Sequence, residues 1–506
     1  MHPHAWSPLG VGIVSCLGTA ALLVMTFWGA GTSPDSVHYI RVARAFLALD
    51  TSIDAAATAQ FPPLYPLLLS VVSLFGSDPY AVARWVNAIL FAANICLLGL
   101  AVWDSSSHAR WLSVIGAVLM AGSTSMLLVH GSVLSEPLFL VLVLSGFGLL
   151  ARYLEHDSRP HLLWAALLIG LSVLTRYAGA ACVATGMAGI VLLGRPRLRQ
   201  RIIDTLLFGG VSSLPAVSWA LRNVLVAGTS TNRELGFHPV GWPQAWEALH
   251  TVTAWLLLPQ STPGTIRLAA CIAIFAFATM TFVRTARKHR RAPALATLLL
   301  LFIFGYMGFL AVSISLFDAN TPLDDRILLP VLAAGIVVAL TAIDLAWPLL
   351  RARPSAMYGV VTLLAAFAAG HVIRGSTVIA RGHADGLGFS SVEWQTSTTL
   401  ARVRALPDEI TVYSNAPEIV YLHTRRSARS LPRRRFLMTQ LPNDQYAAEL
   451  AAVGQDIAGS CAVVVYLRSL TQRSMPSEQD LRQDLPLKVL SEDTDGVILT
   501  SPSCQP

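Results

Sequence analysis

Five places in the sequence set ionisable side chains in or beside strongly apolar segments. They are Asp35 in SPDSVHYIRVARAF, Glu136 in LSEPLF, Arg176 in LTRYAG, Arg222 in WALRN, and the run Asp324, Asp325 and Arg326 in PLDDRILLP. A charge at membrane depth is costly, so residues of this kind are expected to take part in function. Acids set among several arginines suit a site that holds an anionic substrate beside a carboxylate base.

Each residue also has a purely structural interpretation. Asp35 precedes a predicted helix over 36–49, where it could be the N-cap. Glu136 stands before a proline at a helix start, where a carboxylate favours the helix dipole. The arginines could anchor helix ends at the headgroup level, and the adjacent pair Asp325 and Arg326 could form a weak local salt bridge. The functional interpretation is favoured because all five places are expected on the same side of the membrane.

The composition shows what kind of chain must position these residues. Of 506 residues, 54% are apolar and only 13% are charged, and the mean hydropathy is +0.58. A soluble chain carries about a quarter charged residues, so a soluble enzyme and a disordered chain are both excluded. We predict a polytopic α-helical membrane protein with about eleven transmembrane helices. The apolar segments lie near 8–30, 78–103, 111–130, 137–154, 161–175, 177–194, 202–225, 265–285, 293–317, 327–349 and 355–373.

The positions of arginine and lysine predict the orientation. The connections RPRLRQR (195–201), RTARKHRR (284–291) and RAR (351–353) hold eleven basic residues and no acid, and the order of the spans places them on one side. By the positive-inside rule this side is the cytoplasm, which puts the amino terminus inside and everything after residue 373 outside. The net charge of +7 is therefore mainly a topology signal, and we expect no nucleic-acid partner.

The first external loop, residues 31–77, has a polar and an apolar part. The polar part contains Asp35, Asp50 and Asp54, and the apolar part is PPLYPLLLSVVSLFG at 62–76. This apolar stretch is short and opens with two prolines. If it crossed the membrane, the arginine-rich connections would fall on the wrong side. We therefore predict a re-entrant or interfacial helix on the outer face.

The last part of the chain has the composition of a soluble domain. We expect residues 1–373 to form the membrane domain and residues 374–506 a small extracytoplasmic α/β domain. Strands are predicted at TVYSN (411–415), at CAVVVYL (461–467) and as a closing pair within 486–500, a helix at PEIVYLH (417–423), and a basic loop at RSARSLPRRR (426–435). Cys461 and Cys504 either form a disulfide in an oxidising compartment or leave Cys504 in a loose tail.

The order of the motifs resembles the GT-C superfamily of polytopic glycosyltransferases, specifically its family 39-like branch, which includes protein O-mannosyltransferases and lipid A aminoarabinose transferases. The matching positions, in chain order, are Asp35 with Tyr39, the Pro-Pro-Leu-Tyr segment that ends at Tyr65, Arg84 with Asn87, Ser135 with Glu136, the Leu-Thr-Arg turn at Arg176, and the span start at Arg326. The resemblance covers most of residues 8–345. It departs from the family where Ser36 replaces a second acid and where Phe61 replaces a lysine of some relatives, which leaves the substrate open.

The resemblance implies a glycosyltransferase in a bacterial inner membrane. Its donor would be a polyprenyl-phosphate sugar, and its acceptor a hydroxyl of an envelope glycan, a lipid or a protein at the outer face, with membrane lipids around it. Asp35 would be the general base of an inverting displacement. Glu136, the second catalytic residue, would orient the acceptor, the sugar or a divalent metal, if a metal is used. The expected substrate-binding residues are Tyr39, Tyr65, Arg84, Arg176, Arg222, Asp325 and Arg326.

The alternative is a transporter or flippase for a lipid-linked or anionic substrate. Such a protein would use the same buried charges for binding without breaking a bond. Many transporters have inverted repeats and a pair of broken spans in matching halves. The sequence shows neither feature. Its candidate charges also gather at one face rather than at the membrane midplane, which favours the transferase.

Overall fold

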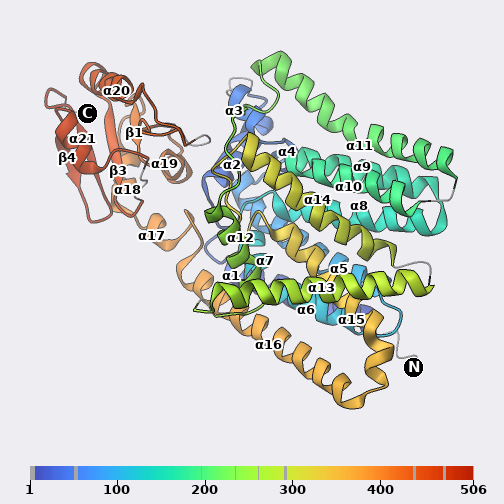
Figure 1. Ribbon diagram of the computed structural model, residues 1–506. Coiled ribbons are helices and arrows are strands. Elements are labelled where there is room, and N and C mark those ends of the chain that lie inside the picture. Colours follow the sequence, from blue (N-terminus) through green and yellow to red (C-terminus); the bar gives the residue numbers. More distant parts are fainter. Residues whose placement is uncertain are drawn as a thin grey trace.

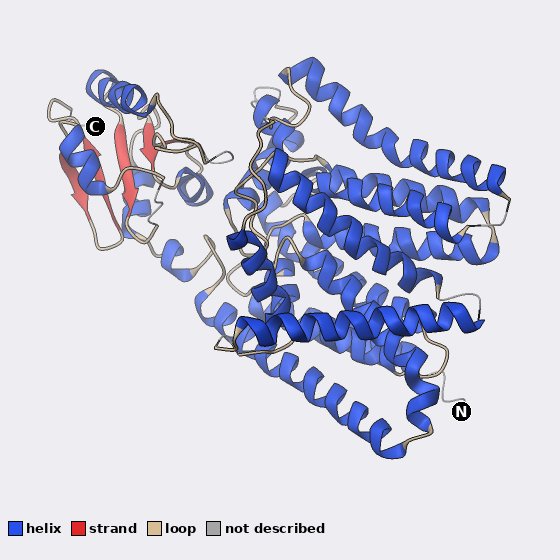
Figure 2. Cartoon of the chain, in the orientation of Figure 1, coloured by secondary structure: helices blue, strands red, loops and turns tan. Residues whose placement is uncertain are grey.

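The chain, in a computed structural model, has two parts that differ in secondary structure. One is a bundle of long helices, and the other is a small domain built on a β-sheet at one end of that bundle (Figures 1 and 2). The structure describes residues 6–50, 55–194, 197–233, 235–259, 261–289, 293–436, 440–470 and 474–504. Four residues named above, Asp54, Arg195, Arg290 and Arg291, lie outside these ranges.

The bundle contains helices of the length and composition that a membrane requires. Within the described ranges, eight helices meet both requirements, and the pair α6 (Leu112–Gly122) and α7 (Thr124–His130), bent by 59°, makes a ninth candidate. The eight are α1 (Trp6–Met25), α5 (Pro79–Ser105), α8 (Glu136–His156), α11 (Leu198–Ala227), α13 (Gly264–His289), α14 (Ala294–Leu316), α15 (Leu329–Arg351) and α16 (Pro354–Asp385).

Two further apolar segments are slightly shorter than a full span. They are α9 (Arg159–Thr175), with 17 residues, and Tyr177–Leu193, which combines the 3-10 turn η1 (Tyr177–Gly179) with α10 (Ala180–Leu193). Helix α9 packs against α8 and α11, so it is part of the bundle. The eleven predicted apolar segments thus all coincide with helical segments, of which eight or nine are long enough to cross on their own.

Several short helices precede or follow the spans. They are α2 (Pro34–Ala48), α3 (Ala55–Gln60), α4 (Leu64–Ser73) and α12 (Trp242–Trp255). Helices α2, α3 and α12 lie at the end of the bundle that faces the sheet domain (Figure 1). Helix α4 packs on α2 and α5 and has ten residues, which is about 15 Å against the roughly 30 Å of hydrocarbon. This length agrees with the short helix predicted for residues 62–76.

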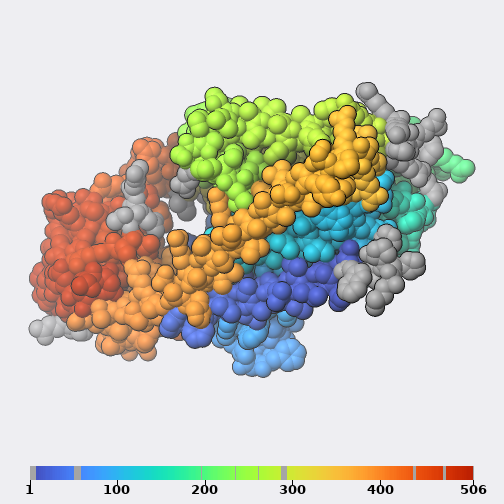
Figure 3. All heavy atoms as spheres, turned by 90° about the horizontal axis from the view of Figure 1, so that it is seen from below, coloured from blue at the N-terminus to red at the C-terminus, as the bar shows by residue number. Residues whose placement is uncertain are grey.

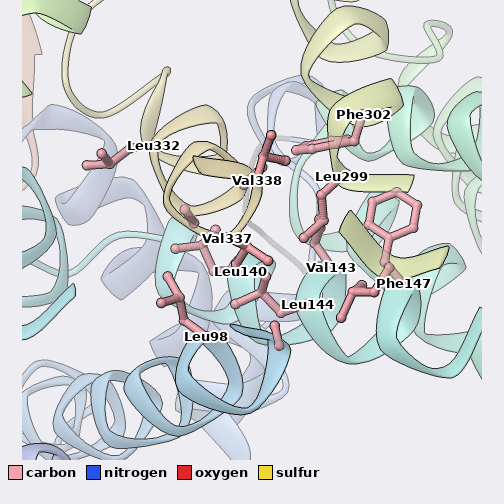
Figure 4. Packing of buried hydrophobic residues seen from close by; sticks show 14 of the residues in the cluster. Leu98, Leu140, Val143, Leu144, Phe147, Leu299, Phe302, Leu332, Val337 and Val338 are labelled. Carbon is pink, nitrogen blue, oxygen red and sulfur yellow. The ribbon is translucent and has the colours of Figure 1, made fainter. Parts of the chain in front are cut away.

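The centre of the bundle is made by α5, α8, α14 and α15. The most hydrophobic stretches of α5, α8 and α15 are 61%, 61% and 67% buried, whereas those of α13 and α16 are 17% and 11% buried and so face lipid. Aliphatic and aromatic side chains interdigitate between the central helices (Figure 4), among them Leu98, Leu140, Val143, Leu144, Phe147, Leu299, Phe302, Leu332, Val337 and Val338. In a bilayer this packing, rather than escape from water, holds helices together.

The arginine-rich connections lie at the end of the bundle opposite the sheet domain. The start of α11, the facing ends of α13 and α14 and the turn between α15 and α16 are all found there, as is the amino-terminal end of the described chain (Figure 1). The described residues that flank these connections therefore share one side, as the order of the spans predicted.

The C-terminal domain is a five-stranded mixed sheet in the order β2-β1-β3-β5-β4. Its strands are β1 (Val412–Ser414), β2 (Ala428–Ser430), β3 (Val463–Leu467), β4 (Lys488–Glu492) and β5 (Gly496–Thr500), and its helices α17 (Val392–Gln395), α18 (Thr398–Ala405), α19 (Pro417–Thr424), α20 (Tyr446–Ser460) and α21 (Glu478–Asp484). Strands β1, β2 and β3 are parallel, while β5 runs antiparallel to β3 and β4.

Two details of this domain correct or complete the sequence analysis. The basic segment 426–435 is not entirely a loop, because residues 428–430 form the edge strand β2 and pair with residues 412–414. Cys461 and Cys504 form a disulfide, and Cys504 is buried rather than loose.

Helix α16 carries the chain from one end of the bundle to the sheet domain. It lies along a face of the molecule beside α1 and α6, as the orange helix of Figure 3. The expected division at residue 373 falls inside this helix, which continues without a break to Asp385. The segment 386–391 then connects α16 to α17.

Candidate functional site

Two of the predicted acids and two of the predicted arginines meet at the sheet-domain end of the bundle. Arg176 and Arg326 both donate to Oε1 of Glu136. The Nη1 atom of Arg326 also donates to Oδ2 of Asp35, at 2.6 Å. Four segments that are distant in the sequence therefore contribute to one cluster, with two negative and two positive side chains.

Asp35 is free to join this cluster because it is not the N-cap of its helix. The cap of α2 is Ser33, whose side chain accepts a hydrogen bond from the backbone of Ser36, and Pro34 fills the first helical position. Asp35 therefore lies in the first turn, and its carboxylate reaches across to Arg326. The N-cap interpretation of Asp35 is wrong for this reason.

Arg326 is presented by a tight turn before α15. The Asp324 carboxylate accepts hydrogen bonds from the backbone N–H groups of Arg326 and Ile327, both at 3.0 Å. The Tyr306 hydroxyl donates to the carbonyl of Ile327 at 2.9 Å and supports the same turn from α14. These contacts fix the backbone from which the Arg326 side chain reaches both acids.

Burial distinguishes the two acids. The Glu136 side chain is only 1% exposed, whereas that of Asp35 is 31% exposed. A buried carboxylate is tolerated when it is paired and hydrogen-bonded, and Glu136 has two guanidinium partners. Burial lowers the pKa of Arg326, but Glu136 and Asp35 outweigh this and raise it above its ordinary value, so this arginine stays charged. Asp35 is the acid of the cluster that another molecule can reach.

Aromatic side chains line the cluster on the α2 side. The Tyr39 hydroxyl lies 3.3 Å from Oγ of Ser135, and the Tyr39 ring meets the rings of Phe61 and Tyr65 edge-on. Burial chiefly raises the pKa of Tyr39 to about 12. Burial also shifts the pKa of the neighbouring His38, but downward, to about 4, although the nearby Asp35 carboxylate acts to raise it. Both groups are therefore neutral at physiological pH.

Four predicted site residues bond to partners outside the charged cluster. They are Tyr65, Arg84, Arg222 and Asp325. Tyr65 donates to Oδ1 of Asn87 at 3.0 Å. Arg84 donates to the carbonyl of Leu23 and to the Thr26 hydroxyl, so it ties α5 to α1. Arg222 packs over Trp219 and donates to Thr58 and Asn223.

Asp325 points away from its neighbour Arg326. Its carboxylate accepts from Ser125 at 2.7 Å and from Nε1 of Trp255 at 2.8 Å. It borders a separate hollow of about 50 Å³ together with His371 and Arg374. The local salt bridge between Asp325 and Arg326 is therefore not formed.

The chain was compared with known protein families, curated sequences and solved structures, and only the solved structures gave matches. No protein-family model matches the sequence, and no curated protein sequence matches it significantly. Among solved structures, ArnT from Cupriavidus metallidurans in the apo state has a TM-score of 0.62 at 14% identity, covering 99% of this chain and 98% of its own. The ArnT structure bound to undecaprenyl phosphate gives 0.61, with 97% and 98% covered.

Two other glycosyltransferases show the same architecture. The oligosaccharyltransferase AglB from Archaeoglobus fulgidus, in complex with an inhibitory peptide and a dolichol-phosphate, has a TM-score of 0.56 at 14% identity, covering 92% of this chain and 70% of its own. The arabinofuranosyltransferase AftD from Mycobacteria has 0.56 at 15%, covering 97% and 41%. The protein has the GT-C fold.

The two acids of the cluster, Asp35 and Glu136, are both paired with arginines. Within the described residues, no group of three or more His, Cys, Asp and Glu side chains is placed to hold a metal ion. Glu136 is enclosed by two guanidinium groups, and Asp35 is paired with one of them. Hard cations need several free oxygen ligands, and these two arginine-paired acids do not supply such a set.

Sequence reasoning missed Tyr306 as part of this site. Its ring is buried in α14, and its hydroxyl supports the turn that carries Arg326. A tyrosine inside a long apolar span has no pattern that separates it from a packing residue. Ser135 is half of the predicted Ser-Glu pair, and its hydroxyl lies within 3.5 Å of both Arg176 and Glu136.

The arrangement is suited to acid–base chemistry beside an anion. Arg176 and Arg326 are held on a rigid buried acid, so their charges are positioned before any substrate arrives, which is the condition for strong electrostatic stabilisation. Asp35 offers a partly exposed carboxylate next to them. A hydroxyl could give its proton to the Asp35 carboxylate, and a negatively charged leaving group could pair with Arg176 and Arg326.

Proposed function

We propose that the protein is a membrane glycosyltransferase that moves a sugar from a polyprenyl-phosphate donor to an acceptor hydroxyl. The observation that carries this proposal is the partly exposed Asp35 carboxylate beside the buried Glu136–Arg176–Arg326 cluster. The fold supports the donor class, because the ArnT and AglB structures contain undecaprenyl phosphate and dolichol-phosphate respectively.

In the proposed reaction, the Asp35 carboxylate takes the proton of the acceptor hydroxyl while that oxygen bonds to the anomeric carbon. The bond between this carbon and the phosphate oxygen breaks on the opposite face, so the configuration inverts. The polyprenyl phosphate leaves as an anion and needs no proton. A general base of this kind contributes about 100- to 10,000-fold to a rate.

The other charged residues have supporting roles in this proposal. Arg176 and Arg326 hold the phosphate, because a guanidinium donates in a planar fork that matches phosphate oxygens. Glu136 is not the base, because its carboxylate is enclosed; it holds the two arginines in place. Tyr39 contributes to the wall of the sugar site, whereas Arg84, Arg222 and Asp325 hold helices and loops around it.

We further propose that the reaction takes place at the outer face of a bacterial inner membrane. The arginine-rich connections would lie in the cytoplasm together with the amino terminus. The site and the C-terminal domain, which lie at the opposite end of the bundle, would then be extracytoplasmic. Lipid-linked sugars are the activated donors that reach this face, and the acceptor is an envelope glycan, a lipid or a protein.

The test uses purified full-length protein with a radiolabelled polyprenyl-phosphate sugar. We expect release of free polyprenyl phosphate, and a fall in its rate of about 100-fold or more in Asp35→Asn, since the amide cannot accept the proton. Asp385→Asn, which changes an exposed acid at the end of α16, is the matched control and should behave as wild type.

Two results would contradict the proposal. Near-normal transfer by folded Asp35→Asn would show that another group is the base. Movement of the intact labelled lipid across reconstituted vesicles, without release of polyprenyl phosphate, would show that the protein is a transporter and that its charges only bind.

A further inference from the structure

Three backbone segments meet directly beside the two acids. They are residues 31–33 before α2, residues 131–133 before α8, and residues 387–390 between α16 and α17. Gly31 N–H donates to the Gly131 carbonyl and Val133 N–H donates to the Gly31 carbonyl, both at 2.8 Å. We call this meeting point the three-segment clamp.

The third segment joins through Thr32. Phe389 N–H donates to the Thr32 carbonyl at 2.9 Å, and the hydroxyls of Thr32 and Ser390 lie 2.9 Å apart. Gly31 forms a parallel bridge with Ser132, and Thr32 forms one with Gly388. The connection to the C-terminal domain is thus paired with the segment that leads into α2.

Glycine is required where these backbones approach. A Cβ atom at Gly31 would lie 2.7 Å from Cβ of Leu387 and 2.8 Å from Oγ of Ser132. Gly388 has a φ of +55°, and a Cβ atom there would collide with the carbonyl oxygen of Thr32. A side chain at residue 388 therefore meets backbone, which cannot move aside as a flexible side chain would.

The clamp is separated from each acid by only a few residues along the chain. Thr32 is three residues before Asp35, with the helix cap Ser33 between them, and Val133 is three residues before Glu136. A shift of residues 31–33 relative to 131–133 would therefore change the position of Asp35 against Glu136 and Arg326. Neither acid contacts residues 387–390 itself, so these residues would act through α2.

The C-terminal domain also holds the far end of α2. The guanidinium groups of Arg41 and Arg44 lie 5.8 and 5.5 Å from the Tyr421 ring centroid. Asp78 accepts from Arg44 at 2.9 Å and from Arg425 at 3.1 Å. Helix α2 is thus attached at its start to the connecting segment and along its length to α19.

We propose that Gly388, Thr32 and Ser390 are positioning residues that align Asp35 with Glu136 and Arg326, and that they couple the C-terminal domain to the site. This rests on the proposed function, in which Asp35 is the base. Misplacing a reacting group by about 1 Å can cost about 100-fold in rate. The clamp would therefore set the turnover rate while leaving the donor's phosphate site, on Arg176 and Arg326, intact.

The main test compares Gly388→Ala with Gly359→Ala. The second variant is the matched control, because a Cβ atom at Gly359 on α16 meets nothing within 4 Å. For Gly388→Ala we expect kcat for polyprenyl phosphate release to fall about 100-fold, with KM for the donor within about twofold, since KM reports mainly on the phosphate site. Gly359→Ala should match wild type in both.

A second readout is independent of activity. Hydrogen exchange should speed up in Gly388→Ala for peptides covering residues 29–37 and 131–136, and stay unchanged in Gly359→Ala. The Cys461–Cys504 disulfide, which should still form, reports that the C-terminal domain has folded. If Gly388→Ala fails to fold, two variants of Thr32 replace it in the test. Thr32→Val loses the hydroxyl contact with Ser390, and its kcat should fall. Thr32→Ser keeps this contact, and its kcat should match wild type.

The outcomes separate this inference from the proposed function. If Gly388→Ala or Thr32→Val is folded and keeps the wild-type kcat and exchange rates while Asp35→Asn is inactive, the clamp does not position the base. If the wild type releases no polyprenyl phosphate, the proposed function fails. In that case, unchanged hydrogen exchange of residues 29–37 in Gly388→Ala would by itself contradict the positioning role of the clamp. A rise in donor KM without loss of kcat would show that residues 387–390 act on donor binding instead.

Discussion

At the scale of single residues, the central feature is one carboxylate shared by two guanidinium groups. Glu136 is almost fully buried and accepts from both Arg176 and Arg326. Removing one partner of a buried ion pair leaves an uncompensated charge, which costs about 3–5 kcal/mol. Replacing both partners removes the charges together and costs less, because no ion is left unpaired.

We therefore expect Glu136→Gln to be strongly destabilised and the double variant Glu136→Gln/Arg176→Gln to recover part of the loss. The double variant still has Arg326 paired with Asp35, so one charge of each sign remains. Thermal unfolding of detergent-solubilised protein measures both. A single variant as stable as wild type, or a double variant less stable than the single, would show that the ion pairs do not stabilise this site.

The sequence identified the charged members of the site but not their arrangement. Asp35, Glu136, Arg176 and Arg326 stood out because ionisable groups next to apolar spans need a reason to be there. Asp325 and Arg326 are adjacent in the sequence, yet they face different partners. In an irregular turn no periodicity fixes where a side chain points, and here hydrogen bonds to Asp324 decide it.

At the scale of elements, apolar length predicted the helices well. It did not predict the 59° bend between α6 and α7, since Ser123 at the break resembles any small residue in a span. It also missed β2, because ARS at 428–430 has no alternating apolar pattern, and this edge strand gains its stability from pairing with β1. Backbone pairing of this kind leaves little trace in side-chain composition.

One contact between elements of the C-terminal domain predicts its response to acid. Asp495, between β4 and β5, accepts hydrogen bonds from Thr398 at 3.1 Å, from the Thr399 hydroxyl at 2.9 Å and from Ser397, all at the start of α18. Burial raises the pKa of Asp495, but these hydrogen bonds outweigh it, so the pKa lies below its ordinary value.

A carboxyl whose pKa is lower in the folded state stabilises that state above its unfolded pKa of about 3.9, and this stability is lost as pH falls through the folded pKa. We therefore expect the midpoint temperature of the C-terminal domain to fall as pH drops below about 4. Asp495→Asn should lower the midpoint at pH 7 and weaken the decline in acid.

The measurement is thermal unfolding between pH 3 and pH 7, with hydrogen exchange of residues 397–405 reporting on α18. Asp408→Asn is the control, because that carboxyl is almost fully exposed and a surface ion pair contributes little. If Asp495→Asn and wild type lose stability in parallel as pH falls, the α18 contact is not the source of the acid sensitivity.

At the scale of the whole molecule, the bundle has two chemically different ends. One end carries the arginine-rich connections, and the other carries the charged site, the three-segment clamp and the sheet domain (Figure 1). A basic connection is retained in the cytoplasm because its translocation is disfavoured, whereas acids have little influence on orientation. If this asymmetry orients the chain as proposed, it also decides which compartment supplies the substrates.

The orientation can be tested with single cysteines and a membrane-impermeant maleimide. Arg353 and Glu393 are both exposed and lie before and after the span α16, so Arg353→Cys and Glu393→Cys form a matched pair. We expect Glu393→Cys to react in spheroplasts and Arg353→Cys only after lysis. Reaction of Arg353→Cys in intact spheroplasts would invert the topology, place the site in the cytoplasm, and make a nucleotide-linked sugar as accessible to Asp35 as a lipid-linked one.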